Sequence, residues 1–148
     1  MANGLKLKAA EIEDISVFSA AIEGAITSPG ELGYSAINRT FTLTASRFMW
    51  EQFQTSPENA LRTRCGLLFS DVLSVKAQGI SPDRPTEVLE LLSITCTPGE
   101  DGSAILNLIF AGNAALRLSV ECIDIALTDV GAPWETDKIP DHAETDKN

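Results

Sequence analysis

The residues best suited to chemistry form the string Arg47-Phe48-Met49-Trp50-Glu51, at the end of a predicted strand. Arg47 offers a guanidinium, Trp50 a large flat apolar surface with one N–H donor, and Glu51 a carboxylate. Such a set could bind a partner, because Trp and Arg supply a disproportionate share of interface energy. The competing interpretation is packing, in which the aromatic side chains fill the core and Arg47 pairs with Glu51 or Asp129. Packing is the favoured interpretation.

A second group of candidates lies near the C-terminus, where Trp134 is followed by Asp141 and His142. His142 is the only histidine, so a His-assisted Ser or Cys nucleophile would have to borrow it from an acidic segment. Asp141 and His142 supply only two metal ligands, whereas tight sites need three or four. We therefore expect no catalytic residue, metal site or cofactor, and an exposed histidine or one that docks on the body beside Trp134. The hypothetical binding surface comprises Arg47, Trp50, Glu51, Trp134, Asp141 and His142.

The remaining acidic clusters have structural explanations. Glu11, Glu13 and Asp14 fall in the first turn of a predicted helix, where carboxylates complement the helix dipole. Glu100 and Asp101 belong to a turn without the ligand spacing of a calcium loop. The chain contains no glycine-rich phosphate loop, nucleophile elbow or HExxH string. An enzyme would have to assemble its carboxylates by folding, which leaves no local signature.

Composition points to an ordinary folded protein. Among 148 residues, 44% are hydrophobic and 22% charged, which suits one domain with a sizeable core. The net charge of -10 repels phosphate backbones and anionic lipids, so we expect neither nucleic acid nor a membrane surface as a partner. Cys65, Cys96 and Cys122 form an odd set without CxxC spacing and resemble small buried hydrophobes. The N-terminus lacks the apolar run of a signal peptide, and no stretch suits a membrane span, so a cytoplasmic location is expected.

Hydrophobic periodicity predicts one helix and then a series of strands. Ile15, Phe18 and Ile22 have helical spacing within residues 11–26. The strand candidates are residues 31–36, 40–51, 64–69, 72–78, 88–97, 105–110 and 116–120, and an exposed loop is expected at 54–63. Residues 5–9 permit a further short strand or an extended lead-in.

Residues 103–134 form the longest patterned apolar block and should contribute the centre of the core. Within it, the Ala111-Gly112-Asn113 break predicts a hairpin, since Gly and Asn tolerate the positive φ of tight turns. The segment 120–130 allows two interpretations. Val120, Ile123, Leu127 and Val130 have helical spacing, which we favour, whereas its β-branched residues favour a continued strand.

This order of elements predicts an α+β fold. Strands joined by short turns must pair antiparallel, and a meander of seven strands with an N-terminal helix and a C-terminal capping helix resembles the pleckstrin-homology-like barrel. The alternative is an open antiparallel sheet with both helices on one face. We expect a single domain over residues 1–134 and an acidic tail over 135–148, which could dock through Trp134 or Ile139.

Several short strings also resemble a known family. They occur in the same order and at compatible distances as in the uncharacterised bacterial domain-of-unknown-function family 2948, and they span nearly the whole chain: Leu5-Lys6-Leu7, Arg47 to Glu51, Val120-Glu121-Cys122-Ile123, Thr128-Asp129-Val130, Pro133-Trp134 and Pro140-Asp141-His142. The resemblance implies a single-domain cytoplasmic protein. It implies no activity, cofactor or catalytic residue.

The sequence thus favours a non-catalytic interaction or regulatory module. It would bind another protein, or a second copy of itself, through an exposed strand edge or the surface near Arg47, Trp50 and Trp134. The first alternative is a protein that binds a small or lipid-like molecule in an apolar pocket at the open end of the barrel. The second is an enzyme with a carboxylate-based site, which fold-level reasoning alone cannot support.

Overall fold

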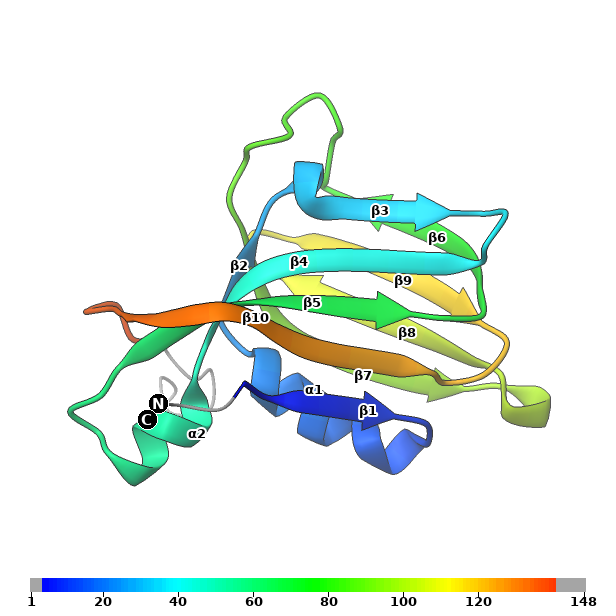
Figure 1. Ribbon diagram of the computed structural model, residues 1–148. Helices are drawn as coiled ribbons and strands as arrows, with labels where there is room; N and C mark the ends of the chain where they lie inside the picture. The colour runs from blue at the N-terminus through cyan, green and yellow to red at the C-terminus, as the bar shows by residue number, and fades with distance from the viewer. Residues whose placement is uncertain (1–3, 141–148) are drawn as a thin grey trace.

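Within its described residues, the chain forms one antiparallel sheet of ten strands with two α-helices (Figure 1). The computed structural model describes residues 4–140. The strands are β1 (Lys6–Ala9), β2 (Ala25–Thr27), β3 (Leu32–Ser35), β4 (Thr40–Phe48), β5 (Leu61–Phe69), β6 (Val72–Gln78), β7 (Leu89–Pro98), β8 (Ala104–Phe110), β9 (Ala114–Val120) and β10 (Ile125–Glu135). The helices are α1 (Ile15–Ile22) and α2 (Trp50–Thr55), and single 3-10 turns occupy Ile12–Asp14, Pro29–Glu31 and Glu100–Gly102.

The sheet folds over itself into two layers. The strand order is β1-β10-β5-β4-β2-β7-β8-β9-β6, and β3 pairs with β4. Figure 1 shows β3, β4, β5, β10 and β1 in front of β7, β8, β9 and β6, with β2 at the corner. The short β2 makes this connection because Ile26 pairs with Ser46 of β4 on one side and with Glu90 of β7 on the other.

Alternation along the strands builds the core between these layers. Phe41, Leu43 and Ala45 of β4 are buried, while the threonines between them face outward. β8 alternates in the same way, with its even-numbered residues from Ala104 to Phe110 buried. The period of two places one face of each strand in the core and leaves the other for solvent.

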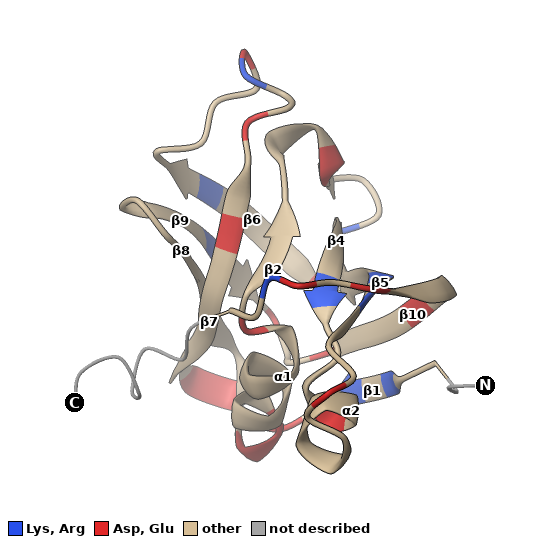
Figure 2. Ribbon diagram, turned by 90° about the vertical axis from the view of Figure 1, so that its left-hand side faces the viewer, with Lys and Arg blue, Asp and Glu red and all other residues tan. Residues whose placement is uncertain are grey.

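Helix α1 covers the side of the molecule between β7 and β1 (Figures 1 and 2). Asp14 Oδ2 accepts the backbone N–H groups of Ala10 at 3.0 Å and Glu11 at 3.1 Å, which fixes the entry into the helix. Its buried residues Ile15, Phe18 and Ile22 confirm the predicted stripe. No helix within residues 4–140 combines the length and the apolar content needed to cross a bilayer.

The helix ends at a corner that several elements share. Gly24 has φ +84°, a conformation that other residues adopt only with strain. Its N–H donates to Leu91 O at 2.8 Å, and its carbonyl oxygen accepts Arg62 Nη2 at 3.2 Å. A Cβ at this position would come within 2.5 Å of Pro140, so glycine also lets the end of the described chain pack here.

The predicted fold class is wrong. In the described part of the chain the sheet has ten strands rather than seven, is not closed into a pleckstrin-homology-like barrel, and has no capping helix at residues 120–130, where one was predicted. The alternative of an open sheet with both helices on one face fails for the same missing helix, although the sheet is antiparallel and open. Residues 5–9 and 25–27 add strands that the sequence prediction left out or left open.

The segment 120–130 shows why the helix prediction failed. Residues from Ile125 onward form β10, which pairs with β1 on one side and β5 on the other. Ile125 and Leu127 are buried, while Thr128 is exposed, as a period of two requires. The pairing of β10 with a strand on each side outweighs the helical spacing of its apolar residues, because tertiary contacts override a weak local preference.

Other elements lie close to their predicted positions. β6 has the predicted bounds, and β3, β7, β8 and β9 differ by a few residues at their ends. The predicted strand at 40–51 ends earlier, because Trp50–Thr55 is α2. The predicted loop at 54–63 is shorter, since β5 begins at Leu61.

The segment after Gly131 continues along the body. Trp134 and Glu135 of β10 lie opposite Arg62 and Leu61, and Thr136 N–H donates to Ala60 O at 2.9 Å. The domain boundary at residue 134 stays a prediction. Asp141 and His142 lie outside the described residues.

A hydrogen bond between α1 and β7 gives the first testable prediction. Ser19 Oγ accepts the backbone N–H of Ile94 at 3.0 Å in a partly buried setting. Ser19→Ala removes that acceptor and should lower the free energy of unfolding by about 1 kcal/mol relative to Ser16→Ala, measured by urea denaturation. Ser16 is exposed on the same helix, so the comparison cancels the change in helix propensity. Equal stability of the two variants would contradict the prediction.

Candidate functional site

The predicted site residue Arg47 lies inside the molecule. Its side chain is 0% exposed and faces the same side of β4 as Phe41, Leu43 and Ala45. Arg47 Nε and Nη2 each donate to one carboxylate oxygen of Asp129 at 2.8 Å. Asp129, 3% exposed, comes from β10, so the ion pair reaches across β5 and joins three strands.

Glu51 completes the coordination of the guanidinium. Arg47 Nη1 and Nη2 donate to its two oxygens at 3.1 and 2.6 Å, and Nη1 also approaches Phe48 O at 3.4 Å. Burial disfavours the charged guanidinium, but the hydrogen bonds and charges of Asp129 and Glu51 outweigh this and raise the pKa of Arg47 above its ordinary value. All the N–H donors of Arg47 are thus engaged, so the group serves packing, as the sequence interpretation favoured, and offers no donor to a partner.

Trp50 also belongs to the packing. Its indole Nε1 donates to Glu23 O at 2.8 Å, which links α2 to the end of α1. Its ring lies 4.6 Å from that of Phe48 and 6.5 Å from that of Phe53, both edge-on. Such contacts between aromatic rings stabilise a small core.

The structure does not assemble the predicted surface as one patch. Arg47, Trp50 and Glu51 meet around α2, but the first two are buried. Trp134 is 42% exposed on β10, opposite Arg62. The roles proposed for Trp134, Asp141 and His142 stay predictions.

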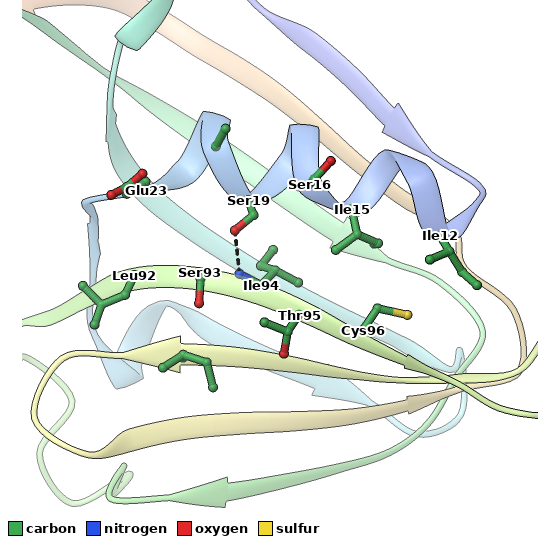
Figure 3. A pocket seen from close by; sticks show the side chains of 12 residues that line it. Ile12, Ile15, Ser16, Ser19, Glu23, Leu92, Ser93, Ile94, Thr95 and Cys96 are labelled. Carbon is green, nitrogen blue, oxygen red and sulfur yellow. Dashed lines mark hydrogen bonds between the residues drawn. The ribbon is translucent and has the colours of Figure 1, made fainter. Parts of the chain in front are cut away.

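A groove that the sequence did not reveal lies between α1 and β7 (Figure 3). Its volume is about 690 Å³. Residues 92–96 of β7 and Ile109 of β8 form one wall, and the opposite wall consists of Ile12, Ile15, Ser16, Ser19, Ala20 and Glu23. Most of this lining is apolar or small, which suits a protein segment or an apolar ligand.

The groove continues past the beginning of α1. A second hollow of about 440 Å³ shares Ile12 with the first and is bordered by Glu11 and Glu13 on one side and Pro98 and Gly99 on the other. The two hollows together follow β7 from Leu92 to Pro98. Six intervals of about 3.4 Å along a strand give a path of roughly 20 Å.

Helix α1 lies along the edge of β7 that faces away from β8. β2 pairs only with Leu89, Glu90 and Leu91, and further along β7 the helix lies where a second partner strand would lie. Ser19 Oγ of α1 accepts the N–H of Ile94 on this edge at 3.0 Å. Because the helix covers the edge, the groove lies between α1 and the side chains of β7 and β8.

Two other edges of the sheet, β1 and β6, are protected against the addition of a further strand. β1 is four residues long and exposes Lys6 and Lys8. β6 has an irregular register after Val72 and exposes Lys76, and Tyr34 Oη donates to Leu73 O at 3.1 Å. Short length, lysines and bulges are the usual means by which proteins prevent strand addition. The edge of β7 is covered by α1 instead.

Acid–base or metal chemistry finds little support. Asp129 and Glu51 are neighbouring carboxylates, but both are bound by Arg47. Within the described residues, no three His, Cys, Asp or Glu side chains are placed to hold a metal ion. Burial raises the pKa of the Cys65 thiol to about 12, with a smaller effect from Asp129, so this thiol is not an activated nucleophile.

The sequence contained a partial signal for the groove. It predicted both α1 and the strand 88–97, and small polar residues at Ser16 and Ser19 lie beside the apolar stripe of the helix. The sequence did not show which element lies along each strand edge, because that depends on the topology of the sheet.

Comparison with known proteins gives one match. Residues 5–142 match a family model described as "Protein of unknown function (DUF2948)". Neither the curated proteins nor the solved structures include a match to this chain.

The buried ion pair gives the second prediction. Asp129→Ala should lower the free energy of unfolding by about 3–5 kcal/mol, because it leaves the buried Arg47 charge with only the half-exposed Glu51 as a partner. Glu87→Ala breaks an exposed ion pair with Arg84 and should cost under about 1 kcal/mol. Urea denaturation of both variants measures the difference, and similar losses would refute a special role for Asp129.

Proposed function

Because this chain belongs to the DUF2948 family of proteins of unknown function, its role has to be inferred from its own surface, and we propose that it is a non-catalytic interaction module. It binds an extended segment of a partner protein, which lies in the apolar groove between α1 and β7. The observation that supports this most directly is the groove itself, which follows β7 for roughly 20 Å and is lined mostly by apolar or small residues.

An extended segment fits the shape and chemistry of the groove. Side chains at alternate positions of such a segment point to the same side, so they would contact Ile12, Ala20 and Ile109 together. Burial of this apolar surface would provide the affinity.

The link between α1 and α2 supplies a natural readout. Trp50 donates to the carbonyl of Glu23, which lines one end of the groove. Occupation of that end would change the surroundings of the indole. Trp50 fluorescence in a Trp134→Phe background would follow binding without a label.

The small-molecule alternative has weaker support. The predicted pocket at the open end of a barrel required a closed sheet, and the sheet is open. A hollow between β3 and β6 reaches Phe41 and Leu116, but its volume of about 220 Å³ is below the roughly 300 Å³ at which ligand pockets usually begin. The long groove along β7 is better matched to a peptide.

Blocking the groove gives the third prediction. Ala20 is exposed on α1 and lines the groove, so Ala20→Trp should fill it without disturbing the core. Peptides selected from a random display library against the wild-type protein should lose at least about tenfold in affinity for this variant. The matched control is Val17→Trp, since Val17 is 57% exposed on the same helix and does not line the groove.

The position of the bound peptide decides the mode of binding. The amide of Cys96, a residue that lines the groove, should gain protection from hydrogen exchange in the complex, because the bound segment would cover this part of β7. Selected peptides that bind the wild type and Ala20→Trp equally, or that leave Cys96 unprotected, would refute the proposal.

A further inference from the structure

Arg117 of β9 is the arginine that the fold uses least. Within residues 4–140 its hydrogen bonding is limited to a long contact, in which Nε donates to Asn107 Oδ1 at 3.5 Å. The other arginines donate to carboxylates or to backbone carbonyl oxygens: Arg39 to Glu121, Arg47 to Asp129, Arg64 to Glu31, Arg84 to Glu87, and Arg62 to Ser46 and Gly24. The net charge of the chain is -10, so a shortage of carboxylates does not explain the exception.

A second cation lies directly opposite Arg117. Lys76 of β6 is its partner in the register of the two strands, and both side chains are exposed. Neither forms an ion pair with another described residue. Like charges directly opposite each other destabilise a sheet. Protection of the β6 edge accounts for Lys76 but not for a second cation on the inner strand β9.

The surroundings of these two cations contain no acidic side chain. β6, β8 and β9 have neither Asp nor Glu, although the chain has 21 acidic residues. A hollow of about 280 Å³ lies at the two cations and is also bordered by Asn107 and Gln78. Side-chain amides add N–H donors to those of the guanidinium and the ammonium group. The set of groups therefore suits an anion such as a carboxylate.

The cation pair lies beside the groove along β7. Asn107 of β8 pairs with Thr95, which lines the groove, on one side and with Arg117 on the other. Thr95 and Arg117 are therefore two strand spacings apart, or about 10 Å. The contact with Asn107 directs the guanidinium toward β8, whose Ile109 also lines the groove. A carboxylate side chain on a segment bound at the level of Thr95 can thus reach Arg117.

Resting on the proposed function, we infer that the partner segment carries an Asp or Glu near its middle and that Arg117 and Lys76 bind this carboxylate. The fork of N–H groups on Arg117 matches the two carboxylate oxygens, and Lys76 adds a second positive charge. The acid belongs at the level of Thr95, because Glu11 and Glu13 border the groove further along and would repel it there. Ion pairs of this kind contribute selectivity more than total affinity.

Peptides from the random display library test the inference, which is the fourth prediction. Sequences selected against the wild-type protein should contain an Asp or Glu at a constant spacing from their apolar positions. The probes are the tightest of these peptides and its twin, in which Asn or Gln replaces the acid. By isothermal titration calorimetry, the twin should bind the wild type roughly fivefold more weakly, as expected for two partly exposed ion pairs. The two peptides should bind the double variant Lys76→Gln/Arg117→Gln almost equally.

A charge-matched variant is the control. Lys6→Gln/Lys8→Gln removes the same charge from exposed positions on β1, in the front layer. The twin should still bind this variant roughly fivefold more weakly than the acidic peptide does. Circular dichroism and urea denaturation establish that both double variants are folded before their affinities are compared.

The outcomes separate the inference from the proposed function. Selected peptides without an acid, or the same loss for the twin on both double variants, would overturn the inference. Weaker binding of those peptides to Ala20→Trp would leave the groove proposal standing. Peptides that bind Ala20→Trp as tightly as the wild type would overturn both. Dimers of the protein alone that Lys76→Gln/Arg117→Gln abolishes, seen by sedimentation equilibrium, would identify a second copy as the source of the carboxylate and overturn the inference.

Discussion

The buried ion pair between Arg47 and Asp129 constrains the whole front layer. Each charge would be strongly unfavourable alone in the core, so β4 and β10 must hold both side chains in register. The pair crosses β5, where Asp129 lies opposite Cys65 and Arg47 lies opposite Thr63. Asp129 Oδ2 also accepts the N–H of Leu5 at 2.8 Å, which ties the beginning of the described chain to the same point. One interaction therefore fixes the relative positions of β1, β10, β5 and β4.

The same network extends to the groove through α2. Glu51 binds Arg47 from the first turn of α2, and Trp50 of that turn donates to Glu23 at the end of α1. The corner at Gly24 then joins α1 to β7 and β5. The helix that forms one wall of the groove is thus held at its C-terminal end by contacts to both layers. A wall fixed in this way can present a preformed surface, which reduces the entropic cost of binding.

An open sheet has edge strands with one unpaired side, and the way in which each of these sides is protected or covered is the most informative feature of this surface. Lysines, short strands and an irregular register protect β1 and β6. On β7 the helix α1 stands beside the edge, and Ser19 accepts one edge N–H. The helix therefore covers this edge, and an apolar groove with acidic residues at its ends runs between α1 and β7. Arg47, Trp50 and Glu51, which the sequence made the leading candidates, instead maintain the scaffold.

The sequence by itself determined the alternating strands from β3 to β9, the apolar stripe of α1, membership of the family, and the pairing of Arg47 with Glu51 or Asp129. These features depend on local periodicity or on the rule that a buried charge needs a partner. The phase of β4 even placed Arg47 on the same face as Phe41 and Leu43. Only the tertiary structure decided that residues 125–135 form a strand, that the sheet stays open, and that α1 covers the edge of β7. Each of these depends on which distant segment lies alongside a strand, and a hydrogen bond between strands leaves no mark in the sequence of either one.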